Sequence, residues 1–438
     1  MISRLIPKRI PKLGFAIERR ELRTSSRKLH LGQPQRAARA IVWTALRLPR
    51  YQAVIPLNAT TDAPFSLSFV FPCLNEEATL ENVIRQVRAS LDTLDLPCEI
   101  IVADNGSTDR SIQIAHHLGC RVVNVPVRGY GAALRAGIEA AQGEYVAFAD
   151  SDGTYFYEHA APLYLISRKH DADMAIASRL KGVIEPGAMP QLHRWLGTPV
   201  LTGLINALFR GKLSDCNSGF RCVRKSSYHR WAIRSDGMEF ASELLIKALK
   251  DKSRLVDMPS GLRPGPEGRV AHLRTWRDGM RHLLFIFSEK PSLFEWIGVL
   301  LVLPATLLQI LATVTGPVAV GKFNIFDTHS QVLLLMAGII GTQFYSFACS
   351  LYLKTEDRPL RLTRKLIAMD EAVLFFVLLS VLVGSSGIVA LLVALWAKSG
   401  FSGLRQTNWF LGAVHLLGVT LMGAIGLLTM HTLKKAKK

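Results

Sequence analysis

The chain has 438 residues, of which 53 are Lys or Arg and 34 are Asp or Glu, so its formal net charge is +19. It is also hydrophobic overall, with a mean hydropathy of +0.22. This length exceeds that of one ordinary domain, and this apolar fraction excludes a disordered chain. A soluble nucleic-acid-binding protein would explain the charge but not the hydrophobicity, whereas a membrane protein with basic cytoplasmic segments explains both. We therefore expect a membrane partner and no nucleic-acid partner.

Residues 1–65 form a basic N-terminal extension. The first 50 residues contain 13 Lys or Arg against only Glu18 and Glu21. Such a charge run predicts a solvated, partly disordered segment; a patch for anionic lipid, or a start site placed too far upstream, also fits the pattern. The extension lacks the apolar run and the small-residue cleavage site of a secretory signal peptide. We expect the part of the chain before the first membrane span to stay in the cytoplasm.

Residues 66–268 alternate short β-rich runs with helical stretches, which predicts an α/β domain with a mainly parallel sheet. The helices between the strands are expected to begin near Glu76, Asp109 and Gly129. The predicted strands are residues 66–71, 98–103, 120–125, 144–149 and 172–177. Ligands of such sheets bind beyond the carboxyl ends of the strands, so the residues directly after each strand are the candidates for a site.

Asp150 and Asp152 follow the predicted strand at residues 144–149. Two carboxylates one residue apart at a strand end can bind one divalent cation, and such an ion bridges phosphate oxygens. The alternative for a lone Asp-x-Asp tripeptide is an acidic turn at a loop entry. Its place after an apolar strand favours a divalent-cation site that neutralises a nucleotide diphosphate, and Asp150 is also a candidate for contacting the nucleotide.

Polar side chains also follow the first two predicted strands, in FPCLNEE (residues 71–77) and VADNGSTD (residues 102–109). There they can hydrogen-bond a base and a ribose, which makes nucleotide-binding candidates of Asn75, Glu76, Asp104 and Asn105. Helix capping is the alternative for Asn75 and Ser107, each of which precedes a predicted helix. Gly129 opens a glycine-rich helix start that can admit a phosphate, although the segment matches neither a Walker motif nor GxGxxG.

The sequence of residues 269–290 predicts an amphipathic helix at the membrane surface. Arg274, Arg277 and Arg281 recur at helical spacing around Trp276, a pattern typical of interfacial helices. These arginines, together with Arg269, are also candidates for closing over a pyrophosphate.

Residues 291–438 predict a domain of four transmembrane helices. Apolar stretches cover residues 293–320, 331–353, 373–396 and 409–433, each long enough for a bilayer core that needs about 20 helical residues. The second loop and the C-terminus are rich in Lys and Arg, so the positive-inside rule places the catalytic half and both termini in the cytoplasm. The cell inner membrane is the expected location. Small residues in the spans, such as Gly412 and Gly418, leave helix association and a homo-oligomer open.

With these motifs the chain resembles glycosyltransferase family 2 with the GT-A fold, and within it the polyprenyl-phosphate (dolichol-phosphate) hexosyltransferases. The resemblance covers roughly residues 66–281 and extends into the membrane half. It rests on PCLNEE, VADNGSTD, RGYGAALRAGIEAAQGEYVAFADSDGTY, ASRLKG, HRWLG, SDCNSGFRC and GMEFASELLIKA, in that order. Two positions depart from the usual pattern: Asn105 stands where a second Asp is more frequent, and Thr154 where Gln is.

The resemblance implies a Rossmann-like catalytic domain and a role for each matching residue. The residues that it assigns to the base and ribose are Pro72, Glu76 and Asp104. The residues that it assigns to Mg2+ or Mn2+ are Asp150 and Asp152. The residues that it assigns to phosphates of the acceptor are Arg179, Arg194 and Arg221, and Asp215 would lie near the transferring sugar. Arginine suits this task because a guanidinium offers a phosphate two parallel donors.

The leading hypothesis is metal-dependent transfer of a hexose, with inversion, from UDP-hexose or GDP-mannose to a polyprenyl phosphate. The attacking phosphate oxygen is already ionised near neutral pH, so metal charge and positioning should carry most of the catalysis. The candidate catalytic residues are Asp152, Asp215, Glu239 and Glu243, and for the last three a salt bridge is the alternative role. At the level of function, the alternatives are transfer to a polysaccharide or protein, and a membrane flippase or scaffold with a vestigial nucleotide domain.

Overall fold

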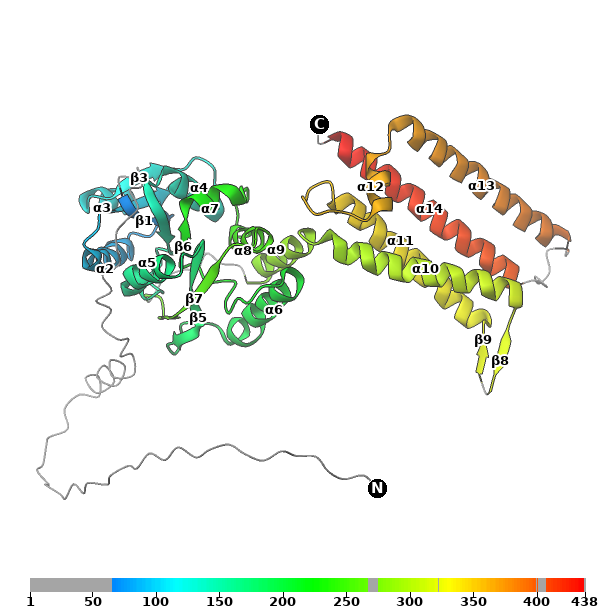
Figure 1. The fold of residues 1–438 in the computed structure, drawn as a ribbon, viewed down its shortest axis with the longest axis horizontal. Coiled ribbons are helices and arrows are strands. Elements are labelled where there is room, and N and C mark those ends of the chain that lie inside the picture. The colour runs from blue at the N-terminus through cyan, green and yellow to red at the C-terminus, as the bar shows by residue number, and fades with distance from the viewer. Residues whose placement is uncertain (1–64, 267–274, 322, 399, 401–406, 437–438) are drawn as a thin grey trace, which may run out of the picture. The chain divides into compact units, whose positions relative to one another are not determined.

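The computed structural model describes residues 65–266, 275–321, 323–398, 400 and 407–436 (Figure 1). Within them an α/β domain is followed by a set of long apolar helices. The basic extension and Arg269, for which the sequence predicts a charged tail and a phosphate contact, lie outside the described residues.

The α/β domain contains one seven-stranded sheet in the order β3-β2-β1-β4-β6-β5-β7. The strands are β1 (Phe65–Cys73), β2 (Cys98–Asp104), β3 (Arg121–Asn124), β4 (Gly143–Phe148), β5 (Met174–Ile184), β6 (Arg221–Arg224) and β7 (Leu255–Leu262). The strands β1 to β4 are parallel, and so are β5 and β7, whereas β6 runs antiparallel to both of its neighbours. The prediction of a mainly parallel sheet is confirmed, and β6 and β7 are additions to the predicted strands.

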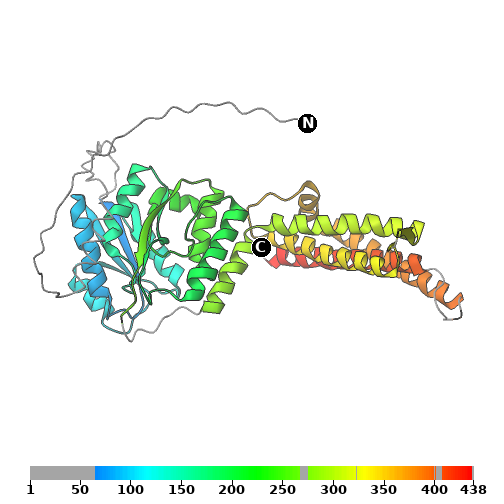
Figure 2. The same cartoon turned by 90° about the horizontal axis from the view of Figure 1, so that it is seen from below.

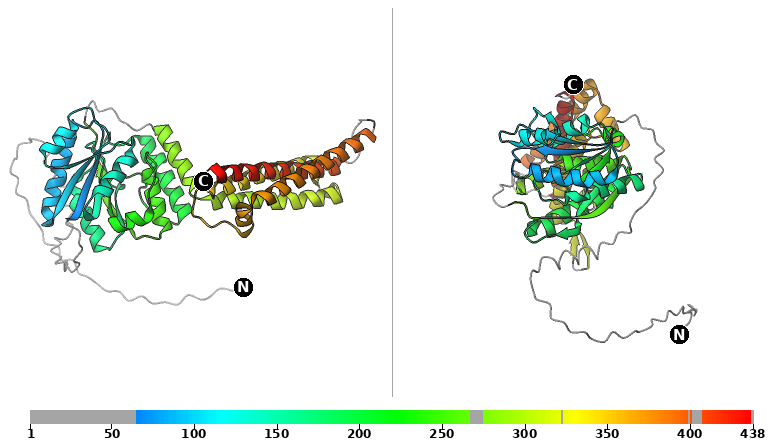
Figure 3. Two further views of the ribbon diagram at one scale, coloured as in Figure 1. Left: turned by 90° about the horizontal axis from the view of Figure 1, so that it is seen from above. Right: turned by 90° about the vertical axis from the view of Figure 1, so that its left-hand side faces the viewer.

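Helices cover both faces of this sheet, as Figures 2 and 3 show. The helices that share a buried cluster on one face are α2 (Leu80–Leu91), α3 (Ser111–His117) and α5 (Ala160–Lys169). Those that contribute to the cluster on the other face are α4 (Tyr130–Ala140), α6 (Thr198–Phe209), α7 (Lys225–Trp231) and α8 (Phe240–Lys250). Because both faces are covered, the central strands β1, β2 and β4 are buried along most of their length, and their sequences are mostly apolar.

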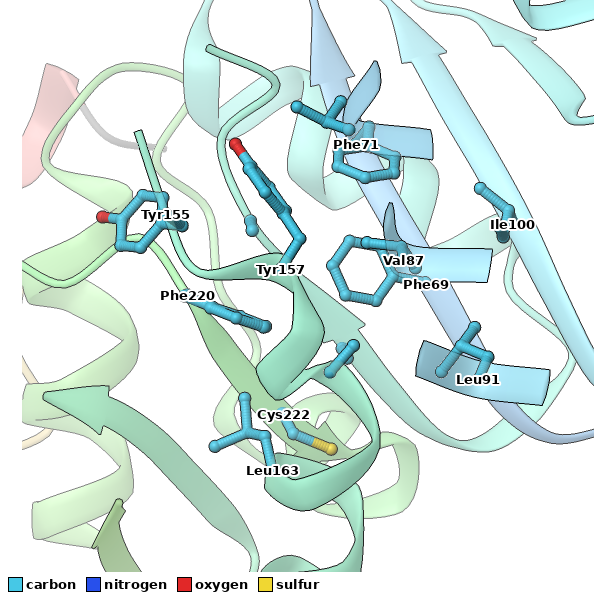
Figure 4. Packing of buried hydrophobic residues seen from close by; sticks show 14 of the residues in the cluster. Phe69, Phe71, Val87, Leu91, Ile100, Tyr155, Tyr157, Leu163, Phe220 and Cys222 are labelled. Atoms are coloured by element: carbon cyan, nitrogen blue, oxygen red, sulfur yellow. The ribbon is translucent and has the colours of Figure 1, made fainter. Parts of the chain in front are cut away.

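The central strand β1 shows how the core is built. Phe69 and Phe71 point to one face, where their ring centroids lie 4.8 Å apart, while Val70 belongs to the cluster on the other face. Figure 4 shows the first face, where these two rings lie close to Tyr157 and Phe220. All of these side chains are fully buried. The central strands are therefore held in a tightly packed core, and this packing fixes the positions of the residues that follow their carboxyl ends.

Among the residues that the structure describes, four further helices are long and apolar enough to cross a membrane, with mean hydropathies between 1.7 and 2.5. They are α10 (Pro291–Thr315), α11 (Thr328–Leu351), α13 (Glu371–Lys398) and α14 (Thr407–Ala436). The shorter elements around them are α9 (Thr275–Ser288), α12 (Arg361–Ala368) and the two-stranded hairpin β8 (Val318–Val320) and β9 (Phe323–Ile325). The four predicted spans are thus present, with ends shifted by a few residues.

Polar side chains inside the spans bond between helices. The side-chain amide of Gln309 in α10 donates to Oε1 of Gln331 in α11 at 3.0 Å, and Gln331 donates to Oδ1 of Asn408 in α14 at 2.7 Å. Lipid tails offer no hydrogen-bond partner, so the side-chain amide groups of Gln309 and Gln331 donate to side chains of neighbouring helices, while the buried Oε1 of Gln309 accepts no bond from the described residues.

Candidate active site

The candidate site lies at the carboxyl edge of the sheet, where β2, β1 and β4 are adjacent. Cys73 at the end of β1 is in register with Asp104 at the end of β2. The loop after β4 is bonded to β1, because the Ser151 hydroxyl donates to the carbonyl oxygen of Pro72 at 2.7 Å. Strand order therefore brings together the predicted nucleotide-binding residues and the Asp150–Asp152 pair.

Asp104 shapes the turn that follows β2. Its side chain is 2% exposed, and its oxygens accept hydrogen bonds from the backbone amides of Gly106 at 3.0 Å and Ser107 at 3.1 Å. The carboxylate thus fixes the backbone that forms this side of the site.

The loops after β1 and β2 are hydrogen-bonded to each other. The bonds run from Asn75 N to Ser107 Oγ, from Thr108 N to Asn75 Oδ1, from Glu76 N to Ser111 Oγ and from Glu77 N to Asp109 Oδ2, all between 2.8 and 3.0 Å. Asn75 adopts a left-handed conformation with φ of 57°. Helix capping by Asn75 and Ser107 is wrong, because α2 begins later, at Leu80, and α3 begins at Ser111. Their side chains bridge the two loops instead.

Asn105 attaches the loop before α4 to the end of β2. Its amide nitrogen donates to the carbonyl oxygen of Val127 at 2.7 Å, and its Oδ1 accepts from the amide of Gly129 at 2.7 Å. Gly129 has φ of +145°, and a Cβ there would lie 2.0 Å from the carbonyl oxygen of Asp236. This glycine is therefore required for close approach of protein backbone, and the phosphate contact predicted for it stays a prediction.

Asp150 is held from two sides. The Tyr130 hydroxyl, from the first turn of α4, donates to its Oδ1 at 2.8 Å. On the other side lies Gly219, where a Cβ would come within 2.6 Å of Oδ2. Below the side chain, the Tyr157 hydroxyl donates to the backbone oxygen of Asp150 at 2.6 Å. With the Asp150 carboxylate in this orientation, a residue larger than glycine at position 219 would collide with it.

Asp152 is held by its own turn. Both the backbone amide and the hydroxyl of Thr154 donate to its Oδ1, at 3.0 and 2.7 Å. Both aspartates are partly exposed, at the edge where a ligand of the sheet would bind. Within the described residues no group of three or more His, Cys, Asp or Glu side chains could enclose a metal ion. Two carboxylates at an open edge instead fit a cation that completes its oxygen shell with phosphates and water, as Mg2+ commonly does.

Arg179 and Asp215 form a buried ion pair. Nε and Nη2 of Arg179 donate to the two carboxylate oxygens at 2.8 and 2.9 Å, and the side chains are 12% and 0% exposed. Burial alone would raise the pKa of Asp215, but the charge and hydrogen bonds of Arg179 lower it below its ordinary value. A buried carboxylate with a lowered pKa is a weak base, so this geometry does not suit Asp215 to the predicted role of general base.

The other two predicted phosphate-binding arginines lie in contrasting surroundings. Arg221 is 1% exposed, and its guanidinium donates to three backbone carbonyl oxygens, those of Ser218, Ala241 and Cys216, at 2.8 to 2.9 Å. Its guanidinium links the segment before β6 to α8. Arg194 is half-buried and stacks on Trp195, with its guanidinium carbon 5.2 Å from the ring centroid. Trp195 is 71% exposed.

The two predicted glutamates also differ. Glu243 accepts from the backbone amides of Arg234 and Ser235 and pairs with Lys247, so it fastens the loop before α8. Burial tends to raise the pKa of Glu243, and the hydrogen bonds from Lys247 and Ser235 lower it overall. This arrangement is structural. Glu239 is half-buried at the N-cap of α8 and stays a candidate for the base.

Comparison with known proteins identifies the family. Residues 68–231 match the model of glycosyl transferase family 2. The low-salt glycan biosynthesis hexosyltransferase Agl6 of Haloferax volcanii is 36% identical over 293 residues, which are 67% of this chain and 70% of that protein. The chain belongs to glycosyl transferase family 2. It is therefore a glycosyltransferase, and its Rossmann-like α/β domain has the GT-A fold of that family.

Two further matches are a curated relative and a solved structure. The dolichyl-phosphate hexose transferase of Haloferax volcanii is 28% identical over 196 residues, 44% of this chain and 81% of that protein. Among solved structures, glucosyl-3-phosphoglycerate synthase from Mycobacterium tuberculosis, in complex with Mn2+, uridine diphosphate and glucosyl-3-phosphoglycerate, aligns with a TM-score of 0.42 and 24% identity, over 52% of this chain and 80% of that chain.

Sequence reasoning missed three contributors to this site, Tyr130, Thr154 as a partner of Asp152, and Gly219. The signal for Tyr130 was a single aromatic residue between two glycines, and the signal for Gly219 was its place in SDCNSGFRC. Neither pattern reveals its contact with an aspartate about 20 to 70 residues away.

Proposed function

We propose that this glycosyltransferase moves a hexose from a nucleotide sugar to a polyprenyl phosphate at the cytoplasmic face of a membrane, with inversion and with the help of Mg2+ or Mn2+. The observation that carries the proposal is the combination of the Asp150–Asp152 pair with four helices of membrane-spanning length in the same chain. We further propose that residues 66–268 form the catalytic unit, that residues 269–290 connect it to the membrane, and that residues 291–438 anchor it.

On the donor side, the nucleotide would lie across the ends of β1 and β2. The bonded loops around Asn75 and Asp104 would form one wall there, and the Asp150–Asp152 pair would face the diphosphate. A cation bound at this pair would neutralise negative charge on the departing nucleotide diphosphate. The protein's own part is to hold both carboxylates in place before the donor arrives.

On the acceptor side, Arg194 is the best placed of the predicted arginines. Its guanidinium is partly exposed, whereas Arg221 is bound to carbonyl oxygens and two of the nitrogens of Arg179 are bound to Asp215. Trp195 beside it is an exposed aromatic of the kind that favours the membrane interface. A polyprenyl phosphate keeps its tail in the hydrocarbon and raises only its headgroup, so a cation beside an interfacial Trp suits it.

Direct attack by the lipid phosphate gives inversion. One bond forms between a phosphate oxygen and the anomeric carbon while the bond from that carbon to the nucleotide diphosphate breaks. The attacking oxygen is already ionised, so Glu239 need not remove a proton from it, and orientation of the two substrates contributes most of the rate. The relatives named as a hexosyltransferase and a dolichyl-phosphate hexose transferase support this donor and this acceptor class.

The test uses the full chain purified in detergent with Mn2+. It is incubated with UDP-glucose, UDP-galactose, UDP-GlcNAc or GDP-mannose, each with and without a polyprenyl phosphate. We expect release of UDP or GDP that requires the lipid, together with a lipid-linked hexose of inverted anomeric configuration. The Asp152→Asn variant is the control for release by contaminants. Release of UDP or GDP that does not require the lipid would refute the acceptor, and no release with any of the four donors would refute the donor class.

A further inference from the structure

Each carboxylate of the Asp150–Asp152 pair receives a hydrogen bond from a side-chain hydroxyl. Tyr130 donates to Oδ1 of Asp150 at 2.8 Å, and Thr154 donates to Oδ1 of Asp152 at 2.7 Å. The two hydroxyls come from different elements: Tyr130 is the first residue of α4, and Thr154 lies in the loop after β4. An aspartate side chain can rotate about its Cβ–Cγ bond, so a donor on one named oxygen selects one orientation of the carboxylate.

The Tyr130 ring is itself fixed by the loop before α8. A Cβ at Gly131 would lie 2.4 Å from the carbonyl oxygen of Ser235, so this loop touches the first turn of α4. The amide of Ala132 donates to the carbonyl oxygen of Asp236 at 3.1 Å. Phe240 then packs against the Tyr130 ring edge to face, with centroids 6.5 Å apart. The hydroxyl therefore reaches Asp150 from a ring held on several sides.

Glu243 secures the same loop from behind. It accepts from the amides of Arg234 and Ser235, and its side chain is 5% exposed. A continuous series of contacts thus runs from the interior of α8 through the loop to Tyr130 and on to Asp150. On the opposite side of that carboxylate, Gly219 leaves no room for a Cβ. Both features restrict Asp150 to the orientation that Tyr130 sets.

We propose that Tyr130 and Thr154 are positioning residues that hold the two carboxylates ready for a divalent cation bound together with a nucleotide diphosphate. Partners of this kind around a metal site raise affinity because the ligands need not be ordered when the ion binds, and their loss commonly weakens binding about 10- to 100-fold. The inference rests on the cation and nucleotide part of the proposed function and is independent of the sugar and of the lipid.

The experiment measures Mn2+ affinity directly, without sugar transfer. Free Mn2+ is followed by electron paramagnetic resonance while it is titrated into the full chain in detergent with saturating UDP, and again with GDP. Tyr130→Phe removes only the hydroxyl and keeps the ring on Phe240, and Thr154→Val is isosteric. We expect each to weaken Mn2+ binding about 10-fold. Thr154→Ser, which restores a hydroxyl, should recover most of the affinity.

Tyr145→Phe is the matched control. Tyr145 lies on the same strand β4, and its hydroxyl accepts from Nε of Arg224 at 3.0 Å, close to the amino end of the strand rather than the site. We expect its Mn2+ affinity to stay within about 2-fold of the unaltered chain. Nucleotide binding without metal should be the same in all these variants, and so should their melting temperatures.

Unchanged Mn2+ affinity in Tyr130→Phe and Thr154→Val would overturn the proposal. So would an equal loss in Tyr145→Phe, or a loss of metal-free nucleotide binding, because either would indicate general distortion. The Asp152→Asn variant separates this inference from the proposed function. If it binds Mn2+ normally, the cation site itself is wrong; if the cation site behaves as expected but no polyprenyl-linked hexose forms, only the acceptor proposal fails.

Discussion

Replacing Arg179 by Met should destabilise the α/β domain strongly. Met keeps much of the side-chain length but removes the charge, so Asp215 remains as a carboxylate that is 0% exposed. The Asp215 carboxylate would retain the hydrogen bonds from the backbone amides of position 179 and of Asn217, both at 3.1 Å. It would lose both bonds from the guanidinium. Removing one partner of a buried ion pair costs about 3–5 kcal/mol. At about 2–4 °C per kcal/mol for a domain of this size, the melting temperature should fall by about 6–20 °C.

The loss of stability in Arg179→Met should become smaller as the pH falls. With Arg179 present, the pKa of Asp215 lies below its ordinary value, so the pair stabilises the fold fully above about pH 4 and less as the pH falls further. In Arg179→Met the carboxylate is buried without its cation, and burial raises its pKa above the unfolded value. Protonation then relieves the unpaired charge as the pH falls. The difference in melting temperature between the two proteins should therefore narrow from pH 7.5 to pH 5.

Differential scanning fluorimetry of the detergent-solubilised proteins measures both effects. The control is Arg85→Met, which breaks the exposed pair between Arg85 and Glu81, whose side chains are 62% and 54% exposed. Such a pair contributes about 0.3–0.5 kcal/mol, so the control should shift by no more than about 2 °C. A shift for Arg179→Met as small as that of the control, or a large shift that is the same at both pH values, would refute the buried ion-pair account and restore Asp215 as a candidate base.

Three further predictions concern the site and the topology. Asp152→Asn should lower transfer by several orders of magnitude while the melting temperature stays nearly constant; activity that persists in excess EDTA would contradict a metal role. Arg194→Lys should raise the KM for polyprenyl phosphate about 10-fold and leave UDP affinity unchanged, because Lys keeps the charge but not the two-donor fork; a fall in UDP affinity alone would place Arg194 on the donor. A cysteine introduced as Glu356→Cys, in the second loop, should not react with an impermeant reagent added outside intact cells; labelling from outside would reverse the topology.

The sequence predicted the central parallel strands because β1, β2 and β4 are largely buried, so their residues are mostly apolar. It did not predict β6, which has only four residues and an arginine at each end, and which is held by the strands on both sides of it. It also did not predict β7, which contains Pro259 and Gly261. Proline is tolerated there because β7 is an edge strand, and that position is a property of the whole sheet rather than of the segment.

The sequence predicted the site residues that directly follow strand ends. It did not predict the roles of residues such as Arg194 and Arg221, which depend on how deeply each side chain is buried. Arg194 and Arg221 look equivalent in the sequence, each lying in a motif shared with the family. In the folded chain one is partly exposed beside Trp195 and the other is 1% exposed among carbonyl oxygens. The difference comes from packing of β6 against β4 and β5, which no local pattern records. Arg194 is therefore the better candidate for the acceptor.

The bonds between the loops after β1 and β2 have a consequence for engineering donor preference. Asn75 and Glu77 on one loop are matched to Thr108 and Asp109 on the other, side chain to backbone in both directions. Transplanting one loop from a relative with a different donor would leave the other without its partners. Residues 74–77 and 105–111 should therefore be exchanged together, as a single cassette, and a chimera that carries only one of them should lose nucleotide affinity even when every residue that touches the base is correct.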